Sequence, residues 1–239
     1  MAEIGNSRPC VQCSACSMYT LCNPREAPVD FQSPVECRRR IARGEAVYGT
    51  QAPRSSLFAL RAGSLKATLP DAKGGTHILR FLFAGDAAGL HALNGDTAPV
   101  ELSAMEDSEV CVIPAYRAQV RATYSTAIAH RLWSLLSAEL AQAQAHATML
   151  ARLDAAARVA QFLIDHARGS AGRNAPGTVL PLPMSRRELG EHLNLTMEST
   201  SRILSDFQAR GLVRLTRGGV ELLQEDALAQ QARGEAVPA

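Results

Sequence analysis

The sequence lacks the two features that would direct it to or across a membrane. It contains no apolar run of 18 residues, and its first eight residues lack the basic start and apolar stretch of a signal peptide. We therefore expect a cytoplasmic protein with no membrane partner. Its 239 residues are 46% hydrophobic and 20% charged, which excludes a disordered chain and is typical of a globular protein of one or two domains.

Catalytic signatures are also missing. The sequence offers no Ser/His/Asp grouping, no paired-carboxylate motif and no phosphate-binding glycine loop between a strand and a helix. Its six histidines show no spacing typical of metal ligands. We therefore expect a protein that is not an enzyme.

Lysine is scarce, because only two of the 25 basic residues are lysine, and the arginines are unevenly distributed. Residues 151–220 carry ten arginines and six acidic residues, a charge of +4, whereas the rest carries fifteen basic and seventeen acidic residues, a charge of −2. A basic C-terminal region is consistent with a nucleic-acid surface, but a +4 excess becomes informative only with a DNA-binding motif.

Short apolar runs separated by glycines occupy residues 37–114. Runs of this kind with turn signals between them predict an antiparallel barrel or roll, with a short helix near residues 88–93. The glycine-containing segment 71–75 is typical of a turn. The expected strands cover residues 46–48, 57–60, 65–69, 77–83, 100–105 and 110–113.

Residues 126–153 contain neither proline nor glycine and are rich in alanine, which predicts one long helix. Apolar residues recur in it at alternating spacings of four and three, the pattern of a two-helix seam, and this favours a parallel homodimer. The alternative is that the helix packs on its own β-roll. The seam residues are Ala129, Trp133, Leu136, Leu140, Ala143, Ala147 and Leu150.

The C-terminal region has the pattern of a winged helix-turn-helix. After a helix over residues 154–168 and a loop at 169–177, Ser185 and Glu188 form a capping-box pattern that starts a short helix. A turn at 193–195 leads to Thr196 as the next N-cap, and a hairpin over 212–222 follows Gly211. The last nine residues are expected to be frayed.

The second helix of such a motif enters the major groove with its first turns. Those turns carry Glu198, Ser201 and Arg202. Glu198 can accept a hydrogen bond from a cytosine amino group, Arg202 can donate to guanine, and Ser201 can reach either base. The alternative is a surface ion pair between Glu198 and Arg202, which are four residues apart. Four nearby arginines are candidates for phosphate contacts or plain solvated charge: Arg186, Arg187, Arg214 and Arg217.

Five of the six cysteines lie within the first 37 residues. In a reducing cytoplasm they are poor candidates for disulfides. Cys13, Cys16 and Cys22 have the spacing C-x₂-C-x₅-C, and Cys10 is a possible fourth ligand. Spacing alone favours an iron–sulfur cluster and leaves zinc open.

These motifs together resemble the CRP/FNR superfamily, and within it the FNR-type regulators that respond to oxygen through a [4Fe-4S] cluster. The resemblance covers nearly the whole chain and is carried by the cysteine motif and by residues 83–89, 104–114 and 195–202. It implies an α+β fold: an N-terminal β-roll of the cyclic-nucleotide-binding type, a dimerisation helix and a C-terminal winged helix-turn-helix.

The resemblance also implies the roles of particular residues. It makes Cys13, Cys16, Cys22 and Cys111 the cluster ligands and leaves Cys10 and Cys37 as spare thiols. Without it, Cys111 would be interpreted as a small buried hydrophobe on a strand. It implies that Glu198, Ser201 and Arg202 read the bases of palindromic half-sites of the TTGAT type. The implied partners are double-stranded DNA, a second copy of the chain and RNA polymerase, and the implied role is mainly activation.

Two positions depart from the family pattern. Residues 89–100 contain no arginine, so a bound phosphate would lack a bidentate partner and no cyclic nucleotide is expected. Ala143 stands where oxygen-responsive relatives commonly have an acidic seam residue. Repulsion between subunits is then absent at this position, and some dimer is expected without the cluster.

The motifs divide the chain into five parts. They are a cysteine-rich segment (1–24), a β-roll sensor domain (25–124), a dimerisation helix (125–153), a DNA-binding domain (154–226) and a tail (227–239). Two other functions fit the same motifs. One is a CRP/FNR-type regulator controlled by thiol oxidation or zinc without a cluster, and the other is a constitutive DNA-binding protein without a sensor.

Overall fold

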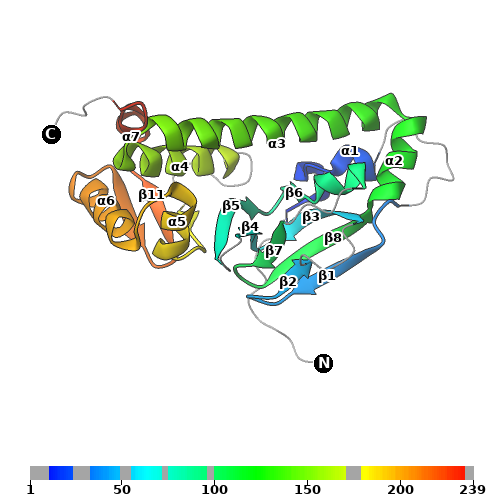
Figure 1. The fold of residues 1–239 in the computed structure, drawn as a ribbon, viewed down its shortest axis with the longest axis horizontal. Coiled ribbons are helices and arrows are strands. Elements are labelled where there is room, and N and C mark those ends of the chain that lie inside the picture. Colours follow the sequence, from blue (N-terminus) through cyan, green and yellow to red (C-terminus); the bar gives the residue numbers. More distant parts are fainter. Residues whose placement is uncertain are drawn as a thin grey trace. The chain divides into compact units, whose positions relative to one another are not determined.

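A computed structural model describes residues 11–23, 33–48, 55–71, 75–95, 100–170 and 179–234. The chain divides into two compact units, residues 1–140 and 141–239, and the boundary falls within the long helix α3 (Thr126–Arg152). Figure 1 labels the helices and strands of each unit. Within the described ranges, no helix has the length and apolar character needed to span a bilayer.

The first unit contains a β-roll made of two antiparallel four-stranded sheets, ordered β1-β8-β3-β6 and β2-β7-β4-β5. All six expected strands overlap observed ones. Apolar side chains such as Leu65, Leu82 and Leu102 fill the space inside the roll. The strands are β1 (Cys37–Ile41), β2 (Ala46–Tyr48), β3 (Ser56–Ala62), β4 (Ser64–Pro70), β5 (Thr76–Phe83), β6 (Ala87–Ala88), β7 (Glu101–Ala104) and β8 (Ser108–Pro114).

Strand β3 of the β1-β8-β3-β6 sheet is buried on both faces, and its alternate residues point to opposite sides. On β3, Phe58 and Leu60 point into the roll, whereas Leu57 and Ala59 belong to a second apolar cluster outside it. This second cluster joins the sheet to the cysteine-bearing segment and to the start of α3 (Figure 1). The elements that surround it are η1 (Cys13–Ala15), α1 (Tyr19–Cys22), η2 (Leu90–Asn94) and α2 (Ala115–Tyr124).

Helix α3 confirms the predicted long helix and has two different faces. Ile128 and Leu132 are buried against the first unit's second apolar cluster. The predicted seam follows a different stripe: Trp133 is 70% exposed and Leu140 is 60% exposed. Of the other seam residues, Leu136, Ala143 and Ala147 are exposed, and Ala129 and Leu150 are half-buried.

The second unit contains the predicted helix-turn-helix and wing. Helix α6 packs its buried Leu204 and Phe207 into the unit's core, and Leu163 of α4 is buried as well. The wing is the hairpin of β10 and β11, extended by β9. The elements are α4 (Ala155–Ser170), β9 (Leu180–Pro181), α5 (Arg186–Leu193), α6 (Met197–Ala209), β10 (Val213–Thr216), β11 (Gly219–Leu222) and α7 (Glu225–Ala232).

Several elements differ from the expectations, including the two-residue strands β6 and β9, which were not predicted. The expected tail from residue 227 begins inside α7, a helix that buries Leu228 completely and carries Glu225 and Asp226 in its first turn. An acidic first turn stabilises a helix start. Strand β1 and helix α2 were not predicted. Residues 1–10 and 235–239, with most of the expected loop at 169–177 and of the turn at 71–75, lie outside the described residues.

Candidate cysteine and DNA-binding sites

The structure brings four of the six cysteines to one place in the first unit. Cys13 lies in η1, Cys16 follows it, Cys22 ends α1, and Cys111 lies on β8. Cys16, Cys22 and Cys111 all pack against the second apolar cluster. Burial raises the pKa of the Cys22 thiol to about 12, and the nearby thiols of Cys16, Cys111 and Cys13 add to this rise. These four side chains are therefore close enough to interact electrostatically.

Cys37 does not join this group. Strands β1 and β8 pair so that Arg38 lies opposite Cys111 and Cys37 lies opposite Val112. Directly opposed residues share a face of the sheet, so Cys37 and Cys111 point to opposite faces. Cys37 is exposed. Cys10 lies outside the described residues.

Arginines offset part of the cost of placing thiols in this site. Burial raises the pKa of the Cys16 and Cys111 thiols, and the positive charge of Arg61 opposes the rise at both of them. Arg131 acts in the same way on Cys16, and Arg38 on Cys111. In the described ranges, no three His, Cys, Asp or Glu side chains are grouped so that they could hold a metal ion. The thiols are therefore gathered without the geometry of a single-ion site.

Hydrogen bonds from two arginines and two main-chain N–H groups attach the described part of the cysteine-bearing segment to the rest of the first unit. Arg121 of α2 donates from Nη1 to the Leu21 carbonyl at 2.8 Å, and Arg131 of α3 donates from Nε to the Ser17 carbonyl at 2.8 Å. The Ser17 N–H donates to the Gly85 carbonyl at 2.9 Å, and the Val11 N–H donates to the Arg61 carbonyl at 2.8 Å. Met18 and Leu21, both 0% exposed, complete the attachment.

The second unit orders its helix-turn-helix through two N-caps and one tight contact. The Ser185 hydroxyl accepts from the Glu188 N–H at 3.1 Å, and the Glu188 carboxylate accepts from the Ser185 N–H at 2.7 Å, which confirms the predicted capping box. Thr196 caps α6 by accepting from the Ser199 N–H at 3.1 Å. A Cβ at Gly190 would lie 2.8 Å from the Leu195 carbonyl oxygen, so only glycine lets the turn pass α5 this closely.

The expected base-reading residues lie in the first two turns of α6. Glu198 and Arg202 are exposed and Ser201 is half-buried. Glu198 and Arg202 form no ion pair with each other, although the structure describes both side chains. The exposed stripe that they form is therefore available to a partner.

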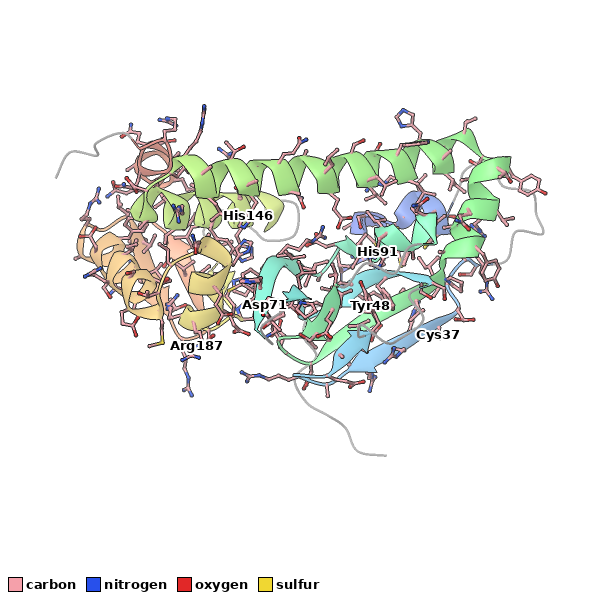
Figure 2. The ribbon with its side chains drawn as sticks, viewed as in Figure 1. Cys37, Tyr48, Asp71, His91, His146 and Arg187 are labelled. Atoms are coloured by element: carbon pink, nitrogen blue, oxygen red, sulfur yellow. The ribbon has the colours of Figure 1, made fainter. Side chains whose placement is uncertain are left out.

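The four arginines considered for phosphate contacts differ in their surroundings. Arg214 forms an ion pair with Glu221 across the wing at 2.6 Å. Arg186 is half-buried, and burial lowers its pKa. Arg187 and Arg217 are exposed, and Arg187 extends away from the second unit (Figure 2). Because Arg214 is paired with Glu221 and Arg186 is half-buried, Arg187 and Arg217 are the freest of the four to reach a phosphate.

Arg158 connects the end of α3 to the turn of the helix-turn-helix. Its Nε donates to the Leu153 carbonyl at 2.9 Å and its Nη2 to the Leu150 carbonyl at 3.1 Å. Its Nη1 donates to the Leu193 carbonyl at 3.2 Å and to the Asn194 carbonyl at 3.4 Å. One guanidinium therefore binds the last carbonyls of two helices, an arrangement that also suits their dipoles.

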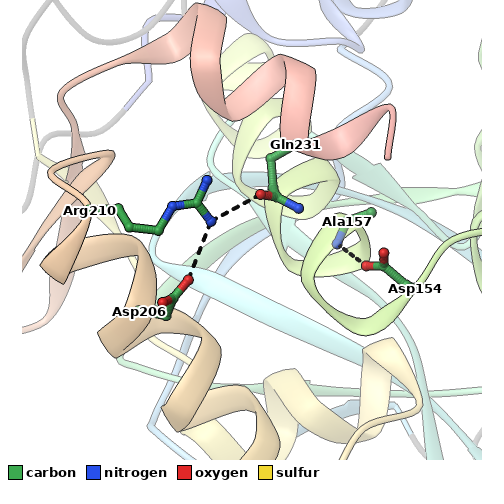
Figure 3. Close-up of polar contacts among 5 residues, drawn as sticks. All are labelled: Asp154, Ala157, Asp206, Arg210 and Gln231. Atoms are coloured by element: carbon green, nitrogen blue, oxygen red, sulfur yellow. Dashed lines mark hydrogen bonds and ion pairs between the residues drawn. The ribbon is translucent and has the colours of Figure 1, made fainter. Parts of the chain in front are cut away.

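Two contacts in Figure 3 complete the frame of the second unit. The Asp154 carboxylate accepts from the Ala157 N–H at 2.8 Å and so caps α4. Arg210, the C-cap of α6, contacts Asp206 at 3.4 Å and donates to the Gln231 side chain of α7 at 3.1 Å. Helix α7 is thus tied to α6.

Two histidines also connect α3 and α5. The rings of His146 and His192 stack with their centroids 4.3 Å apart and their planes 15° apart. Burial lowers the pKa of His146, which is labelled in Figure 2. His166 is buried and bonds the Pro181 carbonyl at 2.8 Å. His146 and His192 pack against each other, and no cysteine takes part in these contacts.

Comparison with known proteins places the chain in a family. Residues 38–121 match the cyclic nucleotide-binding domain, and residues 157–231 match the Crp-like helix-turn-helix domain. The transcriptional regulatory protein btr of Bordetella pertussis is 30% identical, over 91% of this chain and 92% of its own length. The fumarate and nitrate reduction regulatory protein of Escherichia coli is 29% identical, over 93% of this chain and 90% of its own. The solved structure of FixK2 from Bradyrhizobium japonicum has a TM-score of 0.73 at 26% identity, over 85% of this chain and 98% of that one.

The β-roll, the long helix and the winged helix-turn-helix define a transcription regulator that binds DNA, a class of protein without enzymatic activity. The chain belongs to the CRP/FNR family. Both the predicted fold class and the predicted family are therefore confirmed.

Proposed function

We propose that this regulator holds a [4Fe-4S] cluster through Cys13, Cys16, Cys22 and Cys111, and that oxygen controls its DNA binding through this group. The observation that supports the proposal is the gathering of these four thiols from two segments about 90 residues apart, while Cys37 points to the other face of its strand. Four thiolates are a usual ligand set for such a cluster. The name of the Escherichia coli relative, which refers to fumarate and nitrate reduction, suggests respiration as the regulated process.

The site's charge also fits the proposed group. A cluster held by four thiolates is an anion, and the arginines beside Cys16 and Cys111 favour negative charge there. The raised pKa values mean that protons must leave the thiols before they can serve as ligands. When bound, the cluster supplies an oxygen-sensitive connection between the cysteine-bearing segment and β8.

The chain's own contacts pass the order of this segment to α3. Arg131 of α3 holds the Ser17 carbonyl, and Arg121 of α2 holds the Leu21 carbonyl. Between these bonds, Met18 and Leu21 pack against Ile128 and other residues at the start of α3. If the segment is no longer connected to β8, the Ser17 and Leu21 carbonyls are no longer held in place. The first turns of α3 are then less constrained.

Helix α3 presents its exposed stripe to a second copy of the chain. We infer a parallel homodimer because large side chains such as Trp133 and Leu140 are exposed at the predicted seam positions. Ala143 places no charge in that seam, so part of the protein dimerises without the cluster. The complete seam contains Ala129, Trp133, Leu136, Leu140, Ala143, Ala147 and Leu150.

A dimer of this kind binds palindromic half-sites of the TTGAT type in double-stranded DNA. Glu198, Ser201 and Arg202 read the bases from the major groove. The regulator acts in the cytoplasm, mainly as an activator through RNA polymerase, and responds to no cyclic nucleotide. The domain bounds given above remain part of this proposal, except that the DNA-binding domain extends to the end of α7 at Ala232. The phosphates are contacted by arginines beside the motif: Arg186, Arg187, Arg214 and Arg217.

Iron and sulfide analysis of anaerobically prepared protein, with an absorbance spectrum before and after air, tests the cofactor. We expect about four iron and four sulfide ions per chain and a visible absorbance that air removes. Zinc without sulfide would support a zinc-controlled regulator, and neither metal would support thiol-based control or a protein without a sensor.

Serine variants test the ligand assignment. Cys111→Ser is expected to lose iron and sulfide, and the matched control Cys37→Ser is expected to retain them. If Cys111→Ser retained the full content and Cys10→Ser lost it, the four N-terminal cysteines would replace the proposed set.

A further inference from the structure

Arg61 occupies an unusual position beside the cysteines. It lies on β3 where the register with β8 shifts between Leu60 and Ala62. Its Nη1 donates to Glu109 Oε1 at 2.8 Å, and its side chain is only 18% exposed. Its Nε is buried and has no hydrogen-bond partner among the described residues. A cationic side chain thus carries one satisfied nitrogen and one buried donor without an acceptor.

Buried donors of this kind are rare, because an unmet hydrogen bond inside a protein is costly. The neighbourhood of Arg61 identifies the missing acceptor. On β3, Ala59 lies directly opposite Cys111, two residues before Arg61. The Gly85 N–H donates to the Leu60 carbonyl at 2.7 Å and the Gly85 carbonyl accepts from the Ser17 N–H at 2.9 Å, so the residue after Cys16 is held beside the residue before Arg61. The hydroxyl of Ser17, next to Cys16, is a second buried polar group without a partner among the described residues. The buried Nε of Arg61 therefore lies beside the two segments that carry Cys16 and Cys111.

We propose that Arg61 donates its Nε–H to a sulfur atom of the thiolate-held group at Cys16 and Cys111, and thereby raises the reduction potential of that group. The inference deepens the proposed function and rests on it. Glu109 and the Arg61 main chain hold the guanidinium in place. The carboxylate binds Nη1, and the Arg61 carbonyl accepts from Val11, just before the cysteine motif. Arg61 is therefore a positioning residue that acts on the group rather than a ligand.

The direction of the effect follows from charge. Reduction adds an electron to an already anionic group, and a cation with a hydrogen bond to sulfur stabilises the reduced form more than the oxidised form. Removing Arg61 is therefore expected to make the potential more negative and to make the reduced group easier to oxidise.

Arg38 offers a matched control. It carries the same charge and lies directly opposite Cys111 on β1, but it is exposed to solvent. Water and salt screen an exposed charge far better than a buried one. Arg38→Gln therefore removes one positive charge beside the same cysteine and leaves the buried donor in place.

The test measures the midpoint potential and the iron–sulfur stretching frequencies of the anaerobic full chain. We expect a clear negative shift of the potential and altered stretching frequencies in Arg61→Gln, and a much smaller shift in Arg38→Gln. Arg61→Lys keeps the charge without the Nε donor, so its potential should lie between those of the wild type and Arg61→Gln.

Each outcome decides the matter. Equal potentials and frequencies in a fully loaded Arg61→Gln protein and the wild type would overturn the inference and leave the proposed function standing. A wild type without iron and sulfide would overturn the proposed function and the inference with it. Where Arg61→Gln fails to fold or load, Glu109→Ala replaces it. The variant removes the acceptor that holds Nη1 and so lets the guanidinium move, which should alter the iron–sulfur stretching frequencies of the loaded protein. Unchanged frequencies there count against the inference.

Discussion

Replacing Arg158 by methionine removes a guanidinium but keeps most of the apolar stem. The guanidinium makes bonds of 2.9 and 3.1 Å to the end of α3, and of 3.2 and 3.4 Å to the end of α5 and its turn. Each well-formed bond contributes about 1 kcal/mol net, and the longest ones contribute less. The expected loss is therefore about 2 to 3 kcal/mol, concentrated where α3 meets the helix-turn-helix.

Hydrogen exchange of the native full chain measures this loss locally. A change of about 1.4 kcal/mol is a factor of ten, so protection in α5 and the following turn should fall by about 30- to 150-fold. Arg210→Met is the control, because Arg210 binds Asp206 and Gln231 but makes no bond to α3. It should lose less than about 1 kcal/mol, with the effect centred on α6 and α7. If both variants changed protection in α5 equally, the connecting role of Arg158 would be wrong.

Three further predictions concern the DNA contacts, the dimer seam and the N-cap of α6. Arg202→Ala should cost about 1 to 3 kcal/mol on cognate DNA and relax base preference, whereas Arg217→Ala should weaken all sequences alike, and binding titrations on cognate and scrambled duplexes distinguish the two. Ala143→Asp places like charges across the seam, so sedimentation should show more monomer, and unchanged monomer fractions would contradict the proposed register. Thr196→Ala removes the N-cap of α6 and should lower the free energy of unfolding, measured by chemical denaturation, by about 1 kcal/mol. Thr196→Gly should lower it by only about a few tenths of a kcal/mol.

Local patterns made much of the fold predictable. The absence of proline and glycine from residues 126–153 and the capping box at Ser185 each specify structure within a few residues. Elements whose stability comes from distant partners were missed. Strand β1 is rich in arginine and pairs only at the edge of its sheet, and α7 depends on burying Leu228 in the second unit.

The candidate site divides in the same way. Cys13, Cys16 and Cys22 are close in sequence, so their spacing alone indicated a ligand group. Cys111 lies about 90 residues away, and only the family resemblance connected it to the others. The contacts of Arg121, Arg131 and Arg158 described above leave no motif, because these side chains bind main-chain carbonyls.

The most direct test of the central claim is the affinity of the anaerobically reconstituted chain for a palindromic DNA site, measured before and after exposure to air. The account predicts that air weakens binding by about 5- to 150-fold, the usual range of coupling between two sites, in the wild type and in Cys37→Ser. It predicts weak binding under both conditions for Cys111→Ser. Equal affinities before and after air in the wild type would contradict the claim that the cysteine site controls DNA binding.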